Sequence, residues 1–158
     1  MNRGLRILPL VLGLGLWVGA TQKPPVLIRL HLQAPEGAKG TVSVPVTLFQ
    51  PNENIAIQSI PEVTEKEIRR ISTRQDGTVL IDFNEFGQTK LEVGTSTGRG
   101  LILVAIVNGR VVYAPRIDTV ITKGSILLPA GSVTPEEIAQ VNQEIEQTRV
   151  QKLKELER

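Results

Sequence analysis

The stretch AIVNGRVVYAPRIDTVITKG, residues 105–124, carries the strongest fold signals of this 158-residue chain. Asn108 and Gly109 both tolerate the positive φ angles of a type I′ turn, so they predict a tight β-hairpin. Residues 101–107, which lead into the turn, are apolar throughout, as is typical of a central strand covered on both faces. The stretch therefore predicts part of a sheet, and it contains no recognisable catalytic motif.

The second half of this stretch predicts more of the same sheet. Residues 110–113 return antiparallel to the central strand, and Pro115 is expected to end that pairing because it lacks an N–H. Residues 117–122 and 125–128 flank a second tight turn at Gly124. We therefore expect a second hairpin shortly after the first.

Strand patterns also precede this stretch. Residues 26–33 alternate between apolar and polar side chains, and residues 41–49 do the same. Pro45, on the polar face of the second run, cannot donate to a ladder and therefore indicates an edge strand. Residues 55–60 and 78–83 are also strand-like, so most of the chain before the central hairpin predicts sheet.

Capping residues mark the expected helix starts. Thr64 begins a capping box ahead of a short helix or turn that runs through Ile71. Asn84 is expected to cap a helix over residues 85–93, which Gly94 ends. These two short elements are the helices that we expect on one face of the sheet.

The C-terminal segment, residues 134–158, predicts one long helix. Thr134 is its N-cap, followed by a proline and a capping-box glutamate. Its first half carries an apolar stripe, which consists of Ile138, Val141 and Ile145. The second half is too polar for a core, so it is expected to stay solvated or to bind a partner. Together with residues 21–133, this predicts an α+β fold: a mainly antiparallel sheet, two helices on one face and a long C-terminal helix.

The N-terminus reads as a secretory signal peptide over residues 1–20. Arg3 and Arg6 precede an apolar run that ends in small residues, with cleavage expected after Ala20. An uncleaved membrane anchor is the alternative, but a spanning helix needs about 20 apolar residues and this run is shorter. We therefore expect a periplasmic or secreted protein with no membrane span after cleavage.

Composition narrows the classes of function. The chain has no cysteine, which excludes disulfides, thiolate chemistry and a bacterial lipoprotein anchor. Its 18 lysines and arginines and 16 aspartates and glutamates become 16 of each once Arg3 and Arg6 leave with the signal peptide. A neutral mature chain indicates no surface for nucleic acid or for an anionic membrane.

The sequence predicts no enzyme site. His31, the single histidine, lies on the polar face of a predicted strand and is expected to be solvated, and no serine has the context of a catalytic triad. Asp82 and Glu85 are explained more simply by a turn and a cap than by acid–base chemistry. The glycines of residues 94–100 suggest a phosphate loop, but that motif has a strand before it and a helix after it. Here the predicted helix comes first and the strand second, so an ordinary loop is the simpler interpretation. We therefore predict no catalytic, cofactor-binding or metal-binding residue.

Four short motifs, in order, resemble a known family from about Val63 onward. They are GxxxLxxxT at residues 87–95, NGRVVYAPRI at 108–117, ITKG at 121–124 and VTPEE at 133–137. Their order and spacing resemble the head subdomain of the first periplasmic domain of SecD and SecDF, which are accessory subunits of protein export. The resemblance covers roughly half of the chain.

The departures from that family limit what the resemblance implies. Asn108 stands where the family usually has Asp, and Tyr113 replaces a small serine. The strands expected over residues 26–49 have no clear counterpart, and the matched part contains no membrane helices, where the family's proton-coupling residues lie. The resemblance implies a fold and a way of contacting polypeptide, without the export motor.

Three hypotheses of function follow. The first is a non-catalytic secreted or periplasmic binding module that engages polypeptide or an envelope protein through a sheet edge. The second is a structural protein that forms homo-oligomers through its C-terminal helix. The third, an enzyme, requires a pocket that converges on His31 and acids. The residues to which we assign roles are turns and caps, namely Asn108, Gly109, Pro115, Gly124, Thr64 and Thr134.

Overall fold

The computed structural model describes residues 23–48 and 51–157, so the expected signal peptide lies outside the described residues. Its strands form three small antiparallel sheets, in the orders β1-β6-β7, β2-β3 and β4-β5-β8. The strands are β1 (Ile28–Leu32), β2 (Thr41–Val46), β3 (Glu53–Gln58), β4 (Ile68–Thr73), β5 (Val79–Phe83), β6 (Leu103–Val107), β7 (Arg110–Tyr113) and β8 (Ser125–Leu128). The predicted α+β class is confirmed, but the expected single sheet is divided into three.

The predicted central hairpin forms the first sheet. β6 lies between β1 and β7, and most of its side chains are buried. Asn108 has φ 48° and Gly109 has φ 80°, so both residues of the turn lie in the left-handed region that a type I′ turn needs. The apolar run therefore became a strand covered on both faces, as predicted.

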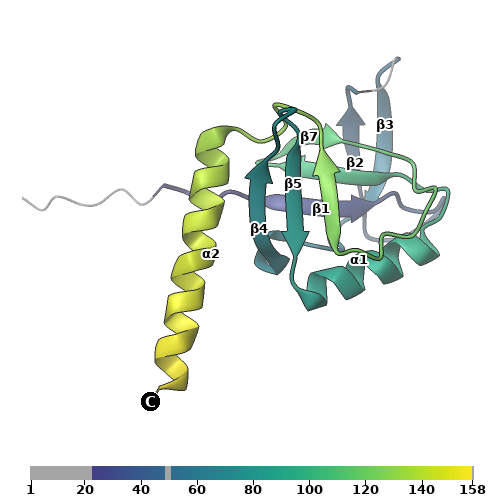
Figure 1. Cartoon of the computed structure of the whole chain (residues 1–158). Helices are drawn as coiled ribbons and strands as arrows, with labels where there is room; N and C mark the ends of the chain where they lie inside the picture. Colours follow the sequence, from purple (N-terminus) through teal and green to yellow (C-terminus); the bar gives the residue numbers. More distant parts are fainter. Residues whose placement is uncertain (1–22, 49–50, 158) are drawn as a thin grey trace, which may run out of the picture.

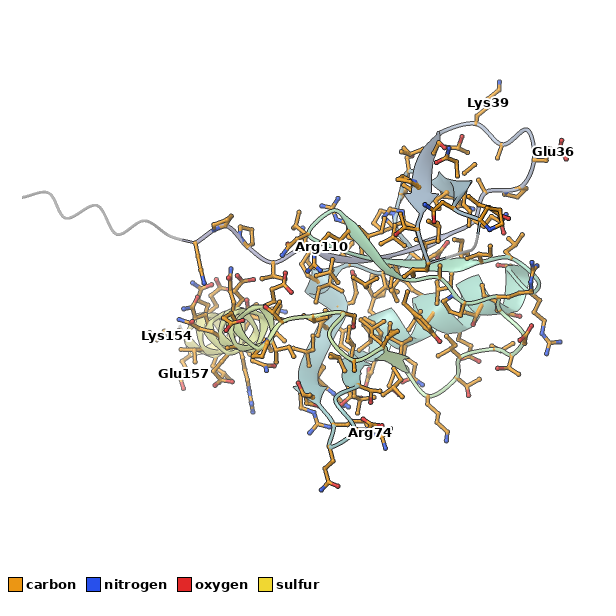
Figure 2. The ribbon with its side chains drawn as sticks, turned by 90° about the horizontal axis from the view of Figure 1, so that it is seen from above. Glu36, Lys39, Arg74, Arg110, Lys154 and Glu157 are labelled. Carbon is orange, nitrogen blue, oxygen red and sulfur yellow. The ribbon has the colours of Figure 1, made fainter. Side chains whose placement is uncertain are left out.

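Two helices and one short 3₁₀ turn accompany the sheets. These are the 3₁₀ turn Glu65–Glu67, α1 (Glu85–Thr97) and α2 (Pro135–Leu156). Figure 1 shows α2 beside β4, with its C-terminal end extending past the sheets, and α1 at the lower end of the β4-β5-β8 sheet. From above, the loop with Glu36 and Lys39 lies at the opposite side of the molecule from Lys154 and Glu157 of α2 (Figure 2).

The expected helix or turn through Ile71 is wrong, because Ile68 begins strand β4. A register shift between Ile68 and Arg70 inserts a bulge into the pairing with β5. The bulge places Ile68 and Ile71 on the same buried face although they are three residues apart. That spacing imitates the helical period, which explains the incorrect prediction.

Two further predictions about local structure are wrong. Residues 117–122 form no strand, and β8 pairs with β5 instead. The chain before β8 is held by α1, because the Ile121 N–H donates to Thr95 Oγ1 (2.9 Å). The helix α1 also continues past Gly94 to Thr97, so the expected loop over residues 94–100 is partly helical.

The core has two parts on the two faces of the first sheet. The larger part lies between the β1-β6-β7 sheet, the β4-β5-β8 sheet and both helices, and the smaller part lies under the β2-β3 hairpin. Because both faces of the first sheet are covered, the prediction of a solvated His31 is wrong: this side chain is 6% exposed. Its Nδ1 lies 2.8 Å from the carbonyl oxygen of Gln58, so it ties β1 to the end of β3.

Candidate functional site

Two of the sheet edges are closed by other parts of the chain. On β1, the Leu30 N–H donates to the Val63 carbonyl (2.9 Å), and the Glu62 N–H donates to the Leu30 carbonyl (2.8 Å). On β4, the side chain of Asn142 from α2 bonds to both backbone groups of Ile71: it accepts from the N–H (3.3 Å) and donates to the carbonyl (2.9 Å). The Asn142 amide thus takes the place of a neighbouring strand.

No described segment covers the edge of β7. Val107 and Arg110 flank the two-residue turn and form its hydrogen-bonded pair, so Val111, opposite Ile106, directs its N–H and carbonyl away from β6. After a bulge the pairing resumes, since the Leu103 N–H donates to the Pro115 carbonyl (2.9 Å). No loop, turn or side chain in the described part of the chain bonds to the outward groups of Val111.

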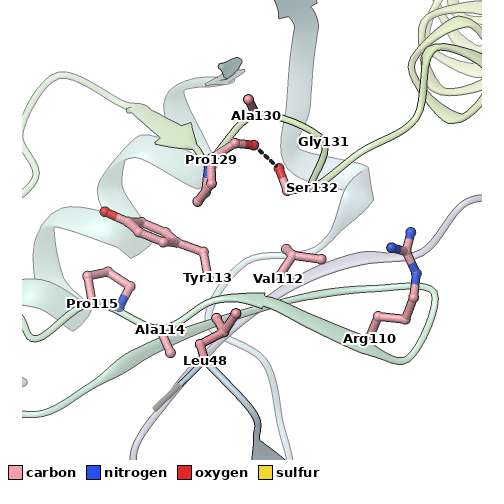
Figure 3. Close-up of a pocket in the computed structure, with 10 residues that line it drawn as sticks. All are labelled: Leu48, Arg110, Val112, Tyr113, Ala114, Pro115, Pro129, Ala130, Gly131 and Ser132. Atoms are coloured by element: carbon pink, nitrogen blue, oxygen red, sulfur yellow. Dashed lines mark hydrogen bonds between the residues drawn. The ribbon is translucent and has the colours of Figure 1, made fainter. Parts of the chain in front are cut away.

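The open edge of β7 borders an apolar cleft of about 530 Å³, which we name the edge cleft. One wall is β7 with its continuation, and the other is the turn that follows β8. Figure 3 shows Val112 and Tyr113 pointing toward the turn, and Leu48 near β7 on the side away from that turn. The lining residues are Leu48, Arg110, Val112, Tyr113, Ala114, Pro115, Pro129, Ala130, Gly131 and Ser132.

A second hollow of about 310 Å³ continues the edge cleft along β8. The two hollows share Tyr113 and Pro115. The Phe83 N–H donates to the Gly124 carbonyl (2.9 Å), so by alternation Leu127 of β8 directs its backbone groups away from β5. In the described part of the chain, the open edges of β7 and β8 therefore border two neighbouring hollows, of which the first is mainly apolar and the second is partly polar.

One carboxylate joins the two sides of the cleft. Glu137 Oε1 accepts hydrogen bonds from Asn108 Nδ2 (2.7 Å) and Arg110 Nη2 (3.1 Å), and Glu137 Oε2 accepts from the Thr134 N–H (2.8 Å). Burial raises the pKa of Glu137, but these hydrogen bonds and the Arg110 charge outweigh burial, so the pKa lies below its usual range. Glu137 is therefore ionised at neutral pH beside the Arg110 end of the cleft.

The other residues singled out in the sequence lie at turns and caps. Thr64 caps the 3₁₀ turn through a capping box with Glu67. Gly124 has φ 63°, and a Cβ there would lie 2.8 Å from the Cβ of Gln88 on α1. β7 ends at Tyr113, yet Pro115 does not end the pairing with the β6 segment. Of these turn and cap residues, only Pro115 lines the cleft. Asn108 and Thr134 donate hydrogen bonds to Glu137, which also binds the lining residue Arg110.

The GxxxLxxxT motif at residues 87–95, one of the four that carry the resemblance, lies on α1, and packing explains its three residue types. Gly87 packs closely on β5, because an added Cβ would lie 2.8 Å from the Cβ of Glu67 and 2.9 Å from that of Phe83. Leu91 is fully buried, and Thr95 holds the segment before β8. These residues position the cleft without lining it.

Few charged side chains line the two hollows. Arg110 is the one charged residue that lines the first hollow, and Arg116 and Asp118 are the charged residues that line the second. Across residues 23–48 and 51–157, no group of three or more His, Asp or Glu side chains is arranged to hold a metal ion. The cleft combines unpaired backbone groups with apolar walls, a combination that suits an extended peptide.

Sequence reasoning did not find this cleft. The sequence pattern assigns no strand to the expected binding edge, and Pro45 correctly indicates a different edge, that of β2. In the sequence, Tyr113 is an isolated aromatic residue that carries no signal of a cleft. The openness of β7 depends on what the rest of the chain leaves uncovered, and no local pattern carries that information.

Comparisons with known proteins find similar folds among solved structures alone. No family model matches the sequence, and no curated protein matches it. Among solved structures, it is similar to SecDF, described as a membrane component that enhances protein export (TM-score 0.51, 22% identity, 74% of this chain and 60% of that chain). It is also similar to SecDF in a super-membrane-facing form (TM-score 0.53, 27% identity, 73% of this chain and 18% of that chain).

These likenesses confirm the resemblance found in the sequence: the chain has a SecD/SecDF-like domain. The match spans less than two thirds of either SecDF chain. Neither helix in the described part of this chain is long and apolar enough to cross a membrane. The solved structures that it resembles are export components, a role compatible with a protein-interacting module.

Proposed function

We propose that this protein is a non-catalytic extracytoplasmic module that binds an extended polypeptide along the open edge of β7. The observation that carries the proposal is the unpaired backbone of Val111 beside an apolar cleft. The secretory pattern of residues 1–20 supports the location. The likeness to a component that enhances protein export supports a polypeptide partner.

The walls of the edge cleft indicate which polypeptide suits it. An added strand would bond to the outward N–H and carbonyl of Val111, and its side chains would alternate between two faces. One face would contact Tyr113 and Pro129, and the other would contact Leu48. Because both surfaces are apolar, burial favours apolar side chains on consecutive positions of the bound segment.

A labelled peptide tests this mode of binding. The probe is fluorescein-labelled Ser-Ser-Leu-Val-Ile-Leu-Ser-Ser, with binding followed by fluorescence anisotropy. Val111→Pro removes the outward N–H without removing a hydrogen bond to β6, because proline is tolerated on the free side of an edge strand. The expected result is a loss of up to about tenfold in affinity, the upper value for one hydrogen bond.

Val111→Ala is the matched control, because it shortens the same side chain but keeps the N–H. It should bind the peptide within about threefold of the original protein. Equal affinities of the proline and alanine variants would contradict binding through the β7 backbone. Failure of the unaltered protein to bind the peptide would reject the proposed function itself.

A further inference from the structure

The carboxylate of Glu137 joins the two walls of the edge cleft at one end. Arg110 lies on β7 and lines the cleft, and its Nη2 lies 3.1 Å and 3.3 Å from the two oxygens of Glu137. Thr134, whose N–H donates to Glu137, lies two residues after Ser132, the last residue of the turn that forms the other wall. We call Glu137, Asn108, Arg110 and Thr134 the carboxylate clamp.

Among the described residues, Glu137 makes the only hydrogen bonds that join these walls. In the described part of the chain, the hydrogen bonds between residues 108–115 and residues 129–137 all end on Glu137. The turn is closed by two hydrogen bonds to the Pro129 carbonyl, from Ser132 Oγ (2.6 Å) and from the Ser132 N–H (3.2 Å). At the Arg110 end, the polar contact that adds to the apolar packing between this side of the molecule and β7 therefore runs through one carboxylate.

The side chain of Asn108 makes hydrogen bonds in the clamp, and this role is separate from that of its backbone in the turn. Its Oδ1 accepts from the Leu27 N–H (3.0 Å), while its Nδ2 donates to Glu137 (2.7 Å). An ionised aspartate accepts hydrogen bonds but donates none, and it would place two like charges in contact. The amide is thus the side chain that satisfies both neighbours.

From this geometry we infer that Glu137 is a positioning residue that holds the edge cleft at its binding width. The inference rests on the proposed function, because it concerns the same site. A cleft that is already formed loses less conformational freedom when the peptide binds, so it binds more tightly. Loosening the clamp should therefore shorten the lifetime of the complex more than it slows association.

The variant Glu137→Gln separates the clamp from the helix cap. A glutamine at this position can still accept from the Thr134 N–H as a capping-box residue, but it loses the ion pair with Arg110. We expect the Ser-Ser-Leu-Val-Ile-Leu-Ser-Ser peptide to bind about three- to tenfold more weakly, with most of the change in the dissociation rate. Glu136→Gln, one residue away and exposed, should leave both rates unchanged.

A second control tests whether a loss of affinity merely reflects a loss of stability. Asn142→Ala weakens the fold at β4 without altering a residue that lines the edge cleft. If the clamp acts by positioning, Asn142→Ala binds the peptide like the unaltered protein while Glu137→Gln does not. If both variants lose affinity in proportion to their lost stability, the positioning role is overturned.

Hydrogen exchange tests the clamp without any peptide. The Arg110 amide, paired with Val107, should exchange at least about threefold faster in Glu137→Gln than in Glu136→Gln, because the hairpin has lost its anchor to α2. Unchanged exchange together with unchanged binding would overturn the inference. If the unaltered protein fails to bind the peptide, the proposed function fails, and the inference, which concerns a binding width, fails with it.

Discussion

The edges of β4 and β7 differ in what covers them. The β4 edge lies against α2, where Asn142 bonds to both backbone groups of Ile71. Across residues 23–48 and 51–157, nothing bonds in this way to the β7 edge, which borders an apolar cleft. Natural sheets protect their free edges, so an uncovered edge beside apolar walls is a feature that needs a reason. The chain thus covers one edge with α2, and in its described part it leaves another edge beside the cleft where we propose that a polypeptide binds.

The largest expected effect lies on the closed side. Ile71 is 1% exposed and belongs to the main core, so Ile71→Ala should lower the free energy of unfolding by about 2–5 kcal/mol. Urea unfolding measures the change. Ile60→Ala, at a site 78% exposed, is the control and should change it by less than about 0.5 kcal/mol. Similar values for the two variants would show that β4 is not packed as described.

Removal of the Asn142 amide tests the closure directly. Asn142→Ala leaves the N–H and carbonyl of Ile71 without their partner, which should cost about 1–3 kcal/mol of unfolding free energy. The neighbouring exposed residue gives the control, Gln143→Ala. Hydrogen exchange at the Ile71 amide should quicken in the first variant alone. Unchanged exchange would mean that the amide does not close this edge.

The open side depends on the hairpin turn. Gly109→Val places a β-branched residue at φ 80° and should cost about 1–2 kcal/mol. No atom lies within 4 Å of an added Cβ there, so the cost would come from the backbone alone. Gly109→Asn should cost less, since asparagine tolerates this conformation. Equal thermal midpoints for both variants would contradict a type I′ turn at the base of β7.

The smallest effect is expected from the end of α2. Val141 is buried, whereas residues 146–157 are exposed along the projecting half of the helix. Deletion of residues 146–158 should therefore shift the thermal midpoint by only a few degrees, because the contacts that close β4 precede the cut. A large shift would mean that the projecting half supports the β4 edge. Light scattering on the same variant tests whether that half also carries self-association.

Local sequence signals were reliable where one short segment decides its own conformation. Asn108 and Gly109 predicted the turn, and Pro45 predicted that β2 is an edge strand. They failed where packing overrides the local pattern: Ile68 and Ile71 have helical spacing but lie on a bulged strand. His31 shares its strand face with Arg29 and Gln33 in the sequence pattern, yet it is buried and its ring contacts the Gln58 carbonyl at the end of β3.

What the sequence by itself determined is the set of elements: the central apolar strand, its hairpin, the capped helices and the α+β class. Turn and cap chemistry acts over a few residues, so it can be read locally. Only the tertiary structure decided which edges are closed, because the contacts that close them join distant residues. Asn142 and Ile71 lie 71 positions apart, and Glu137 and Arg110 lie 27 apart. An open edge is the result of where every other segment packs, and no single stretch of the chain encodes it.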